Sequence, residues 1–109
     1  MSTQETIIHT IHIRIRERKK RFLVVSVPEL HVEPGEQVQW RAVHGQGPFD
    51  IRFDKETVDP TPFPVAETGT DKSPLTVMQG MGGKNFAYSI YLRGDNKLCL
   101  DPSLIVEKP

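Results

Sequence analysis

Residues 32–40 read Val32-Glu33-Pro34-Gly35-Glu36-Gln37-Val38-Gln39-Trp40, a turn pattern followed at once by a strand pattern. Proline fixes φ at its own position and glycine accepts a positive φ at the next, as the two central positions of a type II turn require. After the turn, Val38, Trp40 and Ala42 alternate with polar residues, which is the period-two pattern of a half-buried strand. These residues predict a β-protein with Trp40 in its core.

A second alternating segment lies upstream. Ile11, Ile13 and Ile15 alternate with polar side chains, so we expect them on the buried face of another strand. Residues 22–27, which read Phe-Leu-Val-Val-Ser-Val, are rich in β-branched side chains and would form its return partner. The intervening residues 18–21 are therefore expected at or near the tip of a hairpin.

Strand patterns continue to the carboxyl end, with one long interruption. We expect strands within residues 48–53, 75–78, 86–92 and 98–107, the last interrupted at Asp101-Pro102 because proline cannot donate to a sheet ladder. The segment after Phe53 has no strand pattern and is rich in proline, so it is predicted to be a long, largely irregular loop. It contains four prolines and four of the acidic residues, namely Pro60, Pro62, Pro64, Pro74, Glu56, Asp59, Glu67 and Asp71.

These patterns together predict an all-β chain. About seven short strands punctuated by turns are typical of a Greek-key β-sandwich. With 109 residues the chain has room for one compact core. We expect an amino-terminal extension at residues 1–8 and a single sandwich domain at residues 9–109.

Composition excludes several classes of function. The formal net charge is zero, so the molecule as a whole has no electrostatic preference for nucleic acid or membrane. Neither a signal-peptide pattern nor an apolar stretch of membrane-spanning length is present, so we expect a cytoplasmic location and no membrane partner. The one cysteine, Cys99, lies in an apolar run and is interpreted as a small core residue rather than a catalytic thiol.

The order of the patterns resembles the cupredoxin family over residues 22–107. In that family a turn leads into a strand of form Val-x-aromatic-x-Asn, a histidine follows just before an apolar strand, and a late strand of form Tyr-x-aromatic-x-Cys precedes a second histidine and a methionine. Val38 and Trp40 match the first strand, and Phe86 and Tyr88 match the late one. The resemblance implies a cupredoxin-like sandwich.

The copper ligands of that family have no counterparts in this chain. Ala42 replaces the asparagine, Phe49 stands at the first histidine position, and Ile90 replaces the cysteine, or Leu92 does if the register slips by two. Blue-copper sites need two imidazoles and a thiolate. We therefore predict no metal, no cofactor and no enzymatic activity, with an atypical copper site as a minor alternative.

The most distinctive polar feature is a basic tract. Six cations fall within the eight residues 14–21, opposed only by Glu17: Arg14, Arg16, Arg18, Lys19, Lys20 and Arg21. Such a tract could bind the phosphates of a nucleic acid, an anionic surface or an acidic partner. It could also be a solvated hairpin whose charges protect a sheet edge from aggregation.

The main functional hypothesis is a copper-free protein-interaction or structural module, which could be one subunit of a larger assembly. Its candidate contact residues are His44 and Phe49, in the loop at residues 44–49, and Phe63 in the proline-rich loop. Loop aromatics next to Pro or Gly can anchor a partner, although the same rings could instead fill the end of the core. Nucleic-acid binding through residues 14–21 is the alternative, and exposed sheet edges leave a homo-oligomer open.

Overall fold

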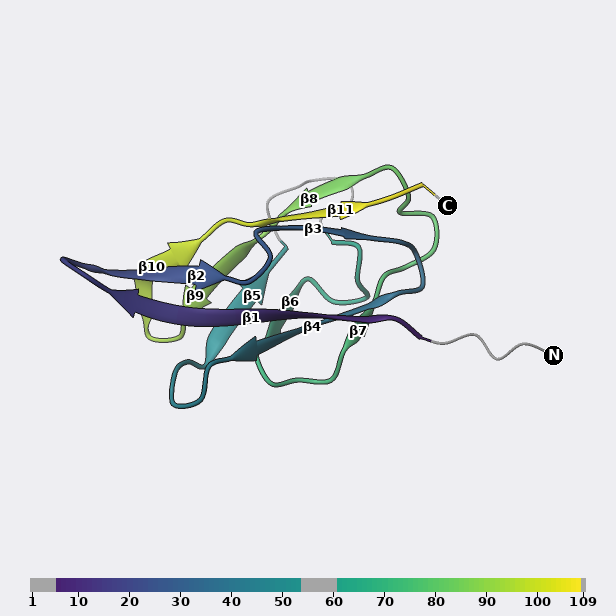
Figure 1. Ribbon diagram of the computed structural model, residues 1–109. Coiled ribbons are helices and arrows are strands. Elements are labelled where there is room, and N and C mark those ends of the chain that lie inside the picture. The colour runs from purple at the N-terminus through teal and green to yellow at the C-terminus, as the bar shows by residue number, and fades with distance from the viewer. Residues whose placement is uncertain (1–5, 54–60, 109) are drawn as a thin grey trace.

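The computed structural model describes residues 6–53 and 61–108, apart from the side chain of Asn96 (Figure 1). These residues form eleven strands and no helix. The strands are β1 (Ile8–Glu17), β2 (Arg21–Val25), β3 (Glu29–Val32), β4 (Gln37–Ala42), β5 (Phe49–Arg52), β6 (Glu67–Gly69), β7 (Leu75–Thr76), β8 (Asn85–Ala87), β9 (Ser89–Leu92), β10 (Asp95–Leu100) and β11 (Ser103–Val106). The predicted all-β sandwich is confirmed.

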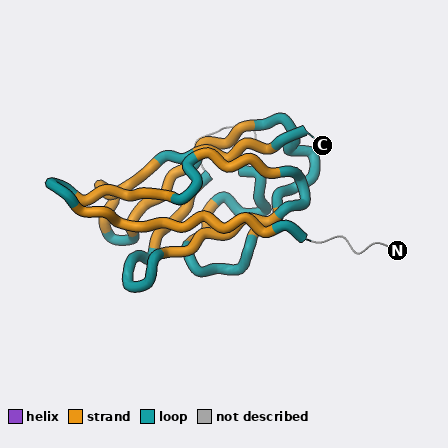
Figure 2. The backbone as a smooth tube through the Cα atoms, viewed as in Figure 1, coloured by secondary structure: helices purple, strands orange, loops and turns teal. Residues whose placement is uncertain are grey.

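The strands form three sheets with the orders β2-β1-β4-β7, β10-β9-β5-β6 and β3-β11-β8. Strand β1 pairs antiparallel with β2 and parallel with β4, and β3 pairs parallel with β11. Figure 2 shows the long strands of these sheets running across the molecule, with loops gathered at its ends. The described strands outnumber the predicted seven because two predicted segments are each divided between two sheets, and because β3 and β6 were not predicted.

The two divided segments had been predicted as single strands, one continuous and one with an interruption. The segment 86–92 is divided at Tyr88 into β8, which pairs with β11, and β9, which pairs with β5 and β10. The segment 98–107 is divided at Asp101-Pro102 into β10 and β11. Proline and the change of sheet fall together there, as expected for a residue that cannot donate to a ladder.

The core lies between the sheets and centres on Trp40. Its ring makes edge contacts with Phe53, Phe63 and Tyr88, with centroids 5.7–6.1 Å apart. Tyr88 also stacks on Phe53 at 4.7 Å, and the Trp40 Nε1–H donates to the Tyr88 hydroxyl at 3.4 Å. Such aromatic pairs add stability beyond their buried area, and burial raises the pKa of Tyr88 to about 12.

The turn at Pro34-Gly35 forms as predicted. Gly35 has a φ of 91°, and the Glu36 N–H donates to the Glu33 carbonyl at 3.1 Å, which closes the turn. The Glu36 carboxylate accepts hydrogen bonds from the Glu33 N–H and from His9 on β1. These contacts fix the start of β1 against β4, with which β1 pairs in parallel.

The long loop has more regular structure than its sequence predicts. Strand β6 lies within it and pairs with β5, so Glu67 belongs to a sheet. Glu56, Asp59 and Pro60 lie outside the described residues. No helix among the described residues is long and apolar enough to span a bilayer.

Candidate binding surface

The hairpin of β1 and β2 extends beyond the body of the sandwich (Figure 1). Pairing runs from Ile13 opposite Val25 to Glu17 opposite Arg21, so residues 18–20 form the tip, as predicted. All six cations of the tract are exposed: Arg14, Arg16, Arg18, Lys19, Lys20 and Arg21. We call the hairpin of residues 13–25, which carries these cations, the basic hairpin.

The basic hairpin has one apolar and one cationic face. Ile13 and Leu23 point into the core because they occupy the inward positions of the pleat. On the outward face the register sets Arg16 opposite Phe22 and Arg14 opposite Val24, and both apolar side chains are half-buried. The guanidinium groups therefore lie beside apolar surface, in an arrangement that the linear sequence does not display.

Arginines inside and outside the basic hairpin differ in their ion pairs. Arg41 is 3.7 Å from Asp71, Arg52 is 3.9 Å from Glu67, and the Arg93 Nη2 donates to Asp50 at 2.7 Å. Over the described part of the chain, by contrast, none of the four hairpin arginines has a carboxylate within ion-pair distance. They are Arg14, Arg16, Arg18 and Arg21. The hairpin thus presents guanidinium groups that the fold itself does not neutralise.

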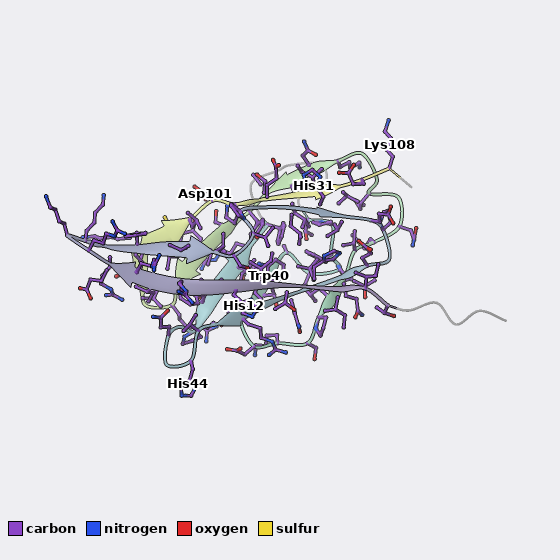
Figure 3. The ribbon with its side chains drawn as sticks, in the orientation of Figure 1. His12, His31, Trp40, His44, Asp101 and Lys108 are labelled. Carbon is purple, nitrogen blue, oxygen red and sulfur yellow. The ribbon has the colours of Figure 1, made fainter. Side chains whose placement is uncertain are left out.

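The proposed aromatic anchors require correction. Phe49 and Phe63 are both buried, with exposed fractions of 0% and 1%, so neither ring is available to a partner. Phe49 begins β5 and points inward together with Ile51, two residues on, while Phe63 packs against Trp40. Only His44 is exposed, and it points away from the sandwich at the loop tip (Figure 3).

A cleft lies between the basic hairpin and the loop that follows β4. Its volume is about 430 Å³, and it is lined by residues 14–18, Val43 and Gln46. Strand β4 ends at Ala42, so β1 continues past its parallel neighbour at this point. The Ile15 N–H donates to Gln46 Oε1 at 2.6 Å, and Gln46 Nε2 donates to the Ile15 carbonyl at 3.3 Å.

The histidines do not gather at one place. Within residues 6–53 and 61–108, no three His, Cys, Asp or Glu side chains are arranged to hold a metal ion. His31 on β3 is hydrogen-bonded to the carboxylates of Glu107 and Glu29. The bond to Glu107 is the main cause that raises the pKa of His31, followed by the bond to Glu29. Cys99 is exposed on β10, which contradicts its interpretation as a core residue: alternation buries Leu98 and turns Cys99 outward.

Comparison with known proteins finds likeness only at the level of structure. No protein-family model matches the chain, and no curated protein matches it. Among solved structures it is similar to amicyanin from Paracoccus versutus (Thiobacillus versutus), with 18% identity, a TM-score of 0.48, and coverage of 97% of this chain and 85% of that one. A reduced Cu(I) form of an amicyanin variant at pH 4 matches with 15% identity, a TM-score of 0.48, and coverage of 97% and 86%.

Because the identities are 15% and 18% and both TM-scores are 0.48, these similarities assign neither a family nor copper binding nor electron transfer to this chain. The functional argument therefore rests on the chain's own surface. Gln46 was not among the predicted site residues, because one glutamine in a loop has no sequence pattern that links it to a strand 31 residues away.

Proposed function

We propose that this protein is a non-catalytic interaction module that docks through the basic hairpin on an acidic surface of a partner protein. The observation that supports this proposal is the contrast in ion pairing. The three arginines of the body each contact a carboxylate, whereas the four of the hairpin contact none among the described residues. Solvated cations that project from a neutral molecule attract an acidic partner and orient its approach.

The outward face of the hairpin favours a protein over a nucleic acid as the partner. Arginine beside half-buried apolar side chains is the combination that dominates the energetics of protein interfaces. Arg14 and Arg16 have this setting, next to Val24 and Phe22. A platform for single-stranded nucleic acid needs several exposed rings between the cations, and Phe22 is one half-buried ring.

Affinity purification from the native cell, followed by mass spectrometry, tests the proposal. The hairpin variant replaces Arg18, Lys19, Lys20 and Arg21 with glutamine, and a control variant replaces Lys72, Lys84, Lys97 and Lys108 with glutamine. Both have the same net charge, so they separate a local contact from a general charge effect. We expect the wild type and the control to retain an acidic protein and the hairpin variant to lose it.

Two outcomes would contradict the proposal. Equal retention by the hairpin variant would show that the basic hairpin is not the contact surface. If the partner is a nucleic acid, the proposed acidic protein is wrong and nucleic-acid binding through the basic hairpin is supported instead. It would appear as a gel shift of labelled DNA or RNA that falls steeply with salt and disappears in the hairpin variant.

A further inference from the structure

From the geometry around Gln46 we propose that the acidic partner binds as an extended segment, which adds as a strand to the free edge of β1 in the basic hairpin. The inference rests on the proposed function and specifies how that surface would bind. It follows from three features of the edge: the lack of a neighbouring strand, the side chain that covers the edge, and the charges around it.

Beyond the end of β4, one side of β1 has no neighbouring strand among the described residues. Odd-numbered residues of β1 direct their N–H and C=O groups toward β4, as shown by the Val43 N–H, which donates to the Ile13 carbonyl at 3.0 Å. Even-numbered residues face β2, since the Ser26 N–H donates to the His12 carbonyl. The backbone groups of Ile15 and Glu17 therefore lie along an edge of β1 that β4 no longer covers, because β4 ends at Ala42.

Gln46 occupies this edge in the manner of a missing peptide group. Its amide accepts from the Ile15 N–H and donates to the Ile15 carbonyl, which are the two bonds that a residue of a neighbouring strand would make. A side-chain amide on a loop can be displaced by a peptide that forms the same two bonds and continues to Glu17. The adjoining cleft of about 430 Å³ provides room beside the edge.

The surrounding charge selects the occupant. Arg14, Arg16 and Arg18 line the cleft with only Glu17 opposing them. A second copy adding by the same edge would bring its own cations against these, and like charges facing each other across a strand pair are destabilising. A strand bearing Asp or Glu would form backbone bonds and ion pairs together. In such strand addition the backbone supplies affinity and the side chains supply specificity.

Synthetic peptides that carry the expected charge and backbone pattern test the inference directly. The probe is a blocked peptide of about eight residues, an ordinary strand length, that alternates glutamate and threonine. Its control is the same peptide N-methylated at every residue, which keeps the charge and removes every backbone donor. Binding is measured by titration calorimetry, and exchange of the Ile15 and Glu17 amide protons is followed by NMR.

We expect the unmodified peptide to bind at least tenfold more tightly than the methylated one, and to slow exchange at both amides. In Gln46→Ala, Ile15 should exchange faster in the free protein and the probe should bind several-fold more tightly, because no side chain has to be displaced. Gln39→Ala is the matched control: Gln39 donates to the Thr10 hydroxyl and not to the β1 backbone, so probe affinity should not change.

Other results would overturn the inference. Equal binding of both peptides with unchanged amide exchange would show docking by charge alone, which leaves the proposed function intact. A Gln46→Ala protein that dimerises through the same amides, in preference to binding the probe, would show that a second copy is the occupant. If neither peptide binds and the hairpin variant still retains its partner, both the strand addition and the proposed function are wrong.

Discussion

At the scale of single residues, Phe49 shows how the pleat decides between a surface role and a core role. Its position next to Pro48 in a loop allowed either interpretation. In the structure Phe49 and Ile51 alternate with Asp50 along β5, and the pleat turns the Phe49 ring inward. The ring lies so close to Gly47 that a Cβ there would approach it to 3.1 Å, so the loop is packed directly on it.

We therefore predict that Phe49→Ala lowers the free energy of unfolding by about 3–5 kcal/mol, as expected when a buried aromatic ring is removed and a cavity remains. Chemical denaturation followed by tryptophan fluorescence measures the change. His44→Ala in the same loop is the control, with an expected change within about 0.5 kcal/mol because the side chain is exposed. Unchanged stability of Phe49→Ala would argue against the buried position.

At the scale of elements, the basic hairpin is a strand pair whose inward face packs on the core and whose outward face carries cations that repel one another. The inward residues Ile13 and Leu23 are buried in the core. The six cations make no ion pairs among the described residues, so they contribute repulsion rather than stability to the folded chain. The apolar face therefore stabilises the hairpin, and its cations can be replaced without loss of stability.

From this we predict that the double variant Arg14→Gln, Arg16→Gln melts at the same temperature as the wild type or slightly higher at low ionic strength. The difference should shrink as added salt screens the repulsion. Arg93→Gln serves as the comparison, since it removes an exposed contact with Asp50 and should lower the melting temperature slightly at low ionic strength. A clear loss of stability in the double variant would indicate that the hairpin arginines have partners within the fold.

At the scale of the whole molecule, the basic charge is concentrated at one end, whereas the histidines are spread over several elements. Residues 14–21 contain six of the fourteen basic residues and only one of the fourteen acidic ones, so a neutral chain has one strongly cationic end. The histidines are scattered over β1, β3 and the loop after β4, and the described residues contain no three-donor cluster. The molecule is thus polarised in charge, and its described histidines lie on separate elements.

We predict that added Cu(II) or Cu(I) leaves the melting temperature unchanged and that no thiolate-to-copper absorption band appears. A ligand that binds the folded state must raise its apparent stability, so thermal melting with and without copper is a direct measurement. Elemental analysis of the purified protein provides an independent check. About one equivalent of copper, with a raised melting temperature that is lost when the histidines are substituted, would require a redox or copper-handling role instead.

Local patterns were sufficient for most of the strands, though not for β3 and β6, and for the Pro34-Gly35 turn and the basic hairpin. Period-two alternation and turn chemistry act over a few neighbouring residues, so they can be recognised in a linear chain. The sequence left open whether Phe63 is an exposed anchor or a core residue, and the exposure of Cys99 and the hydrogen bonds of Gln46 to β1 were not predicted. The burial of Phe63 and the contact of Gln46 with β1 arise from segments that meet only after folding, whereas Cys99 follows the pleat of β10 and was misjudged from its apolar neighbours. The free edge of β1 likewise exists only because β4 ends where β1 continues, a relation between strands that tertiary pairing alone decides.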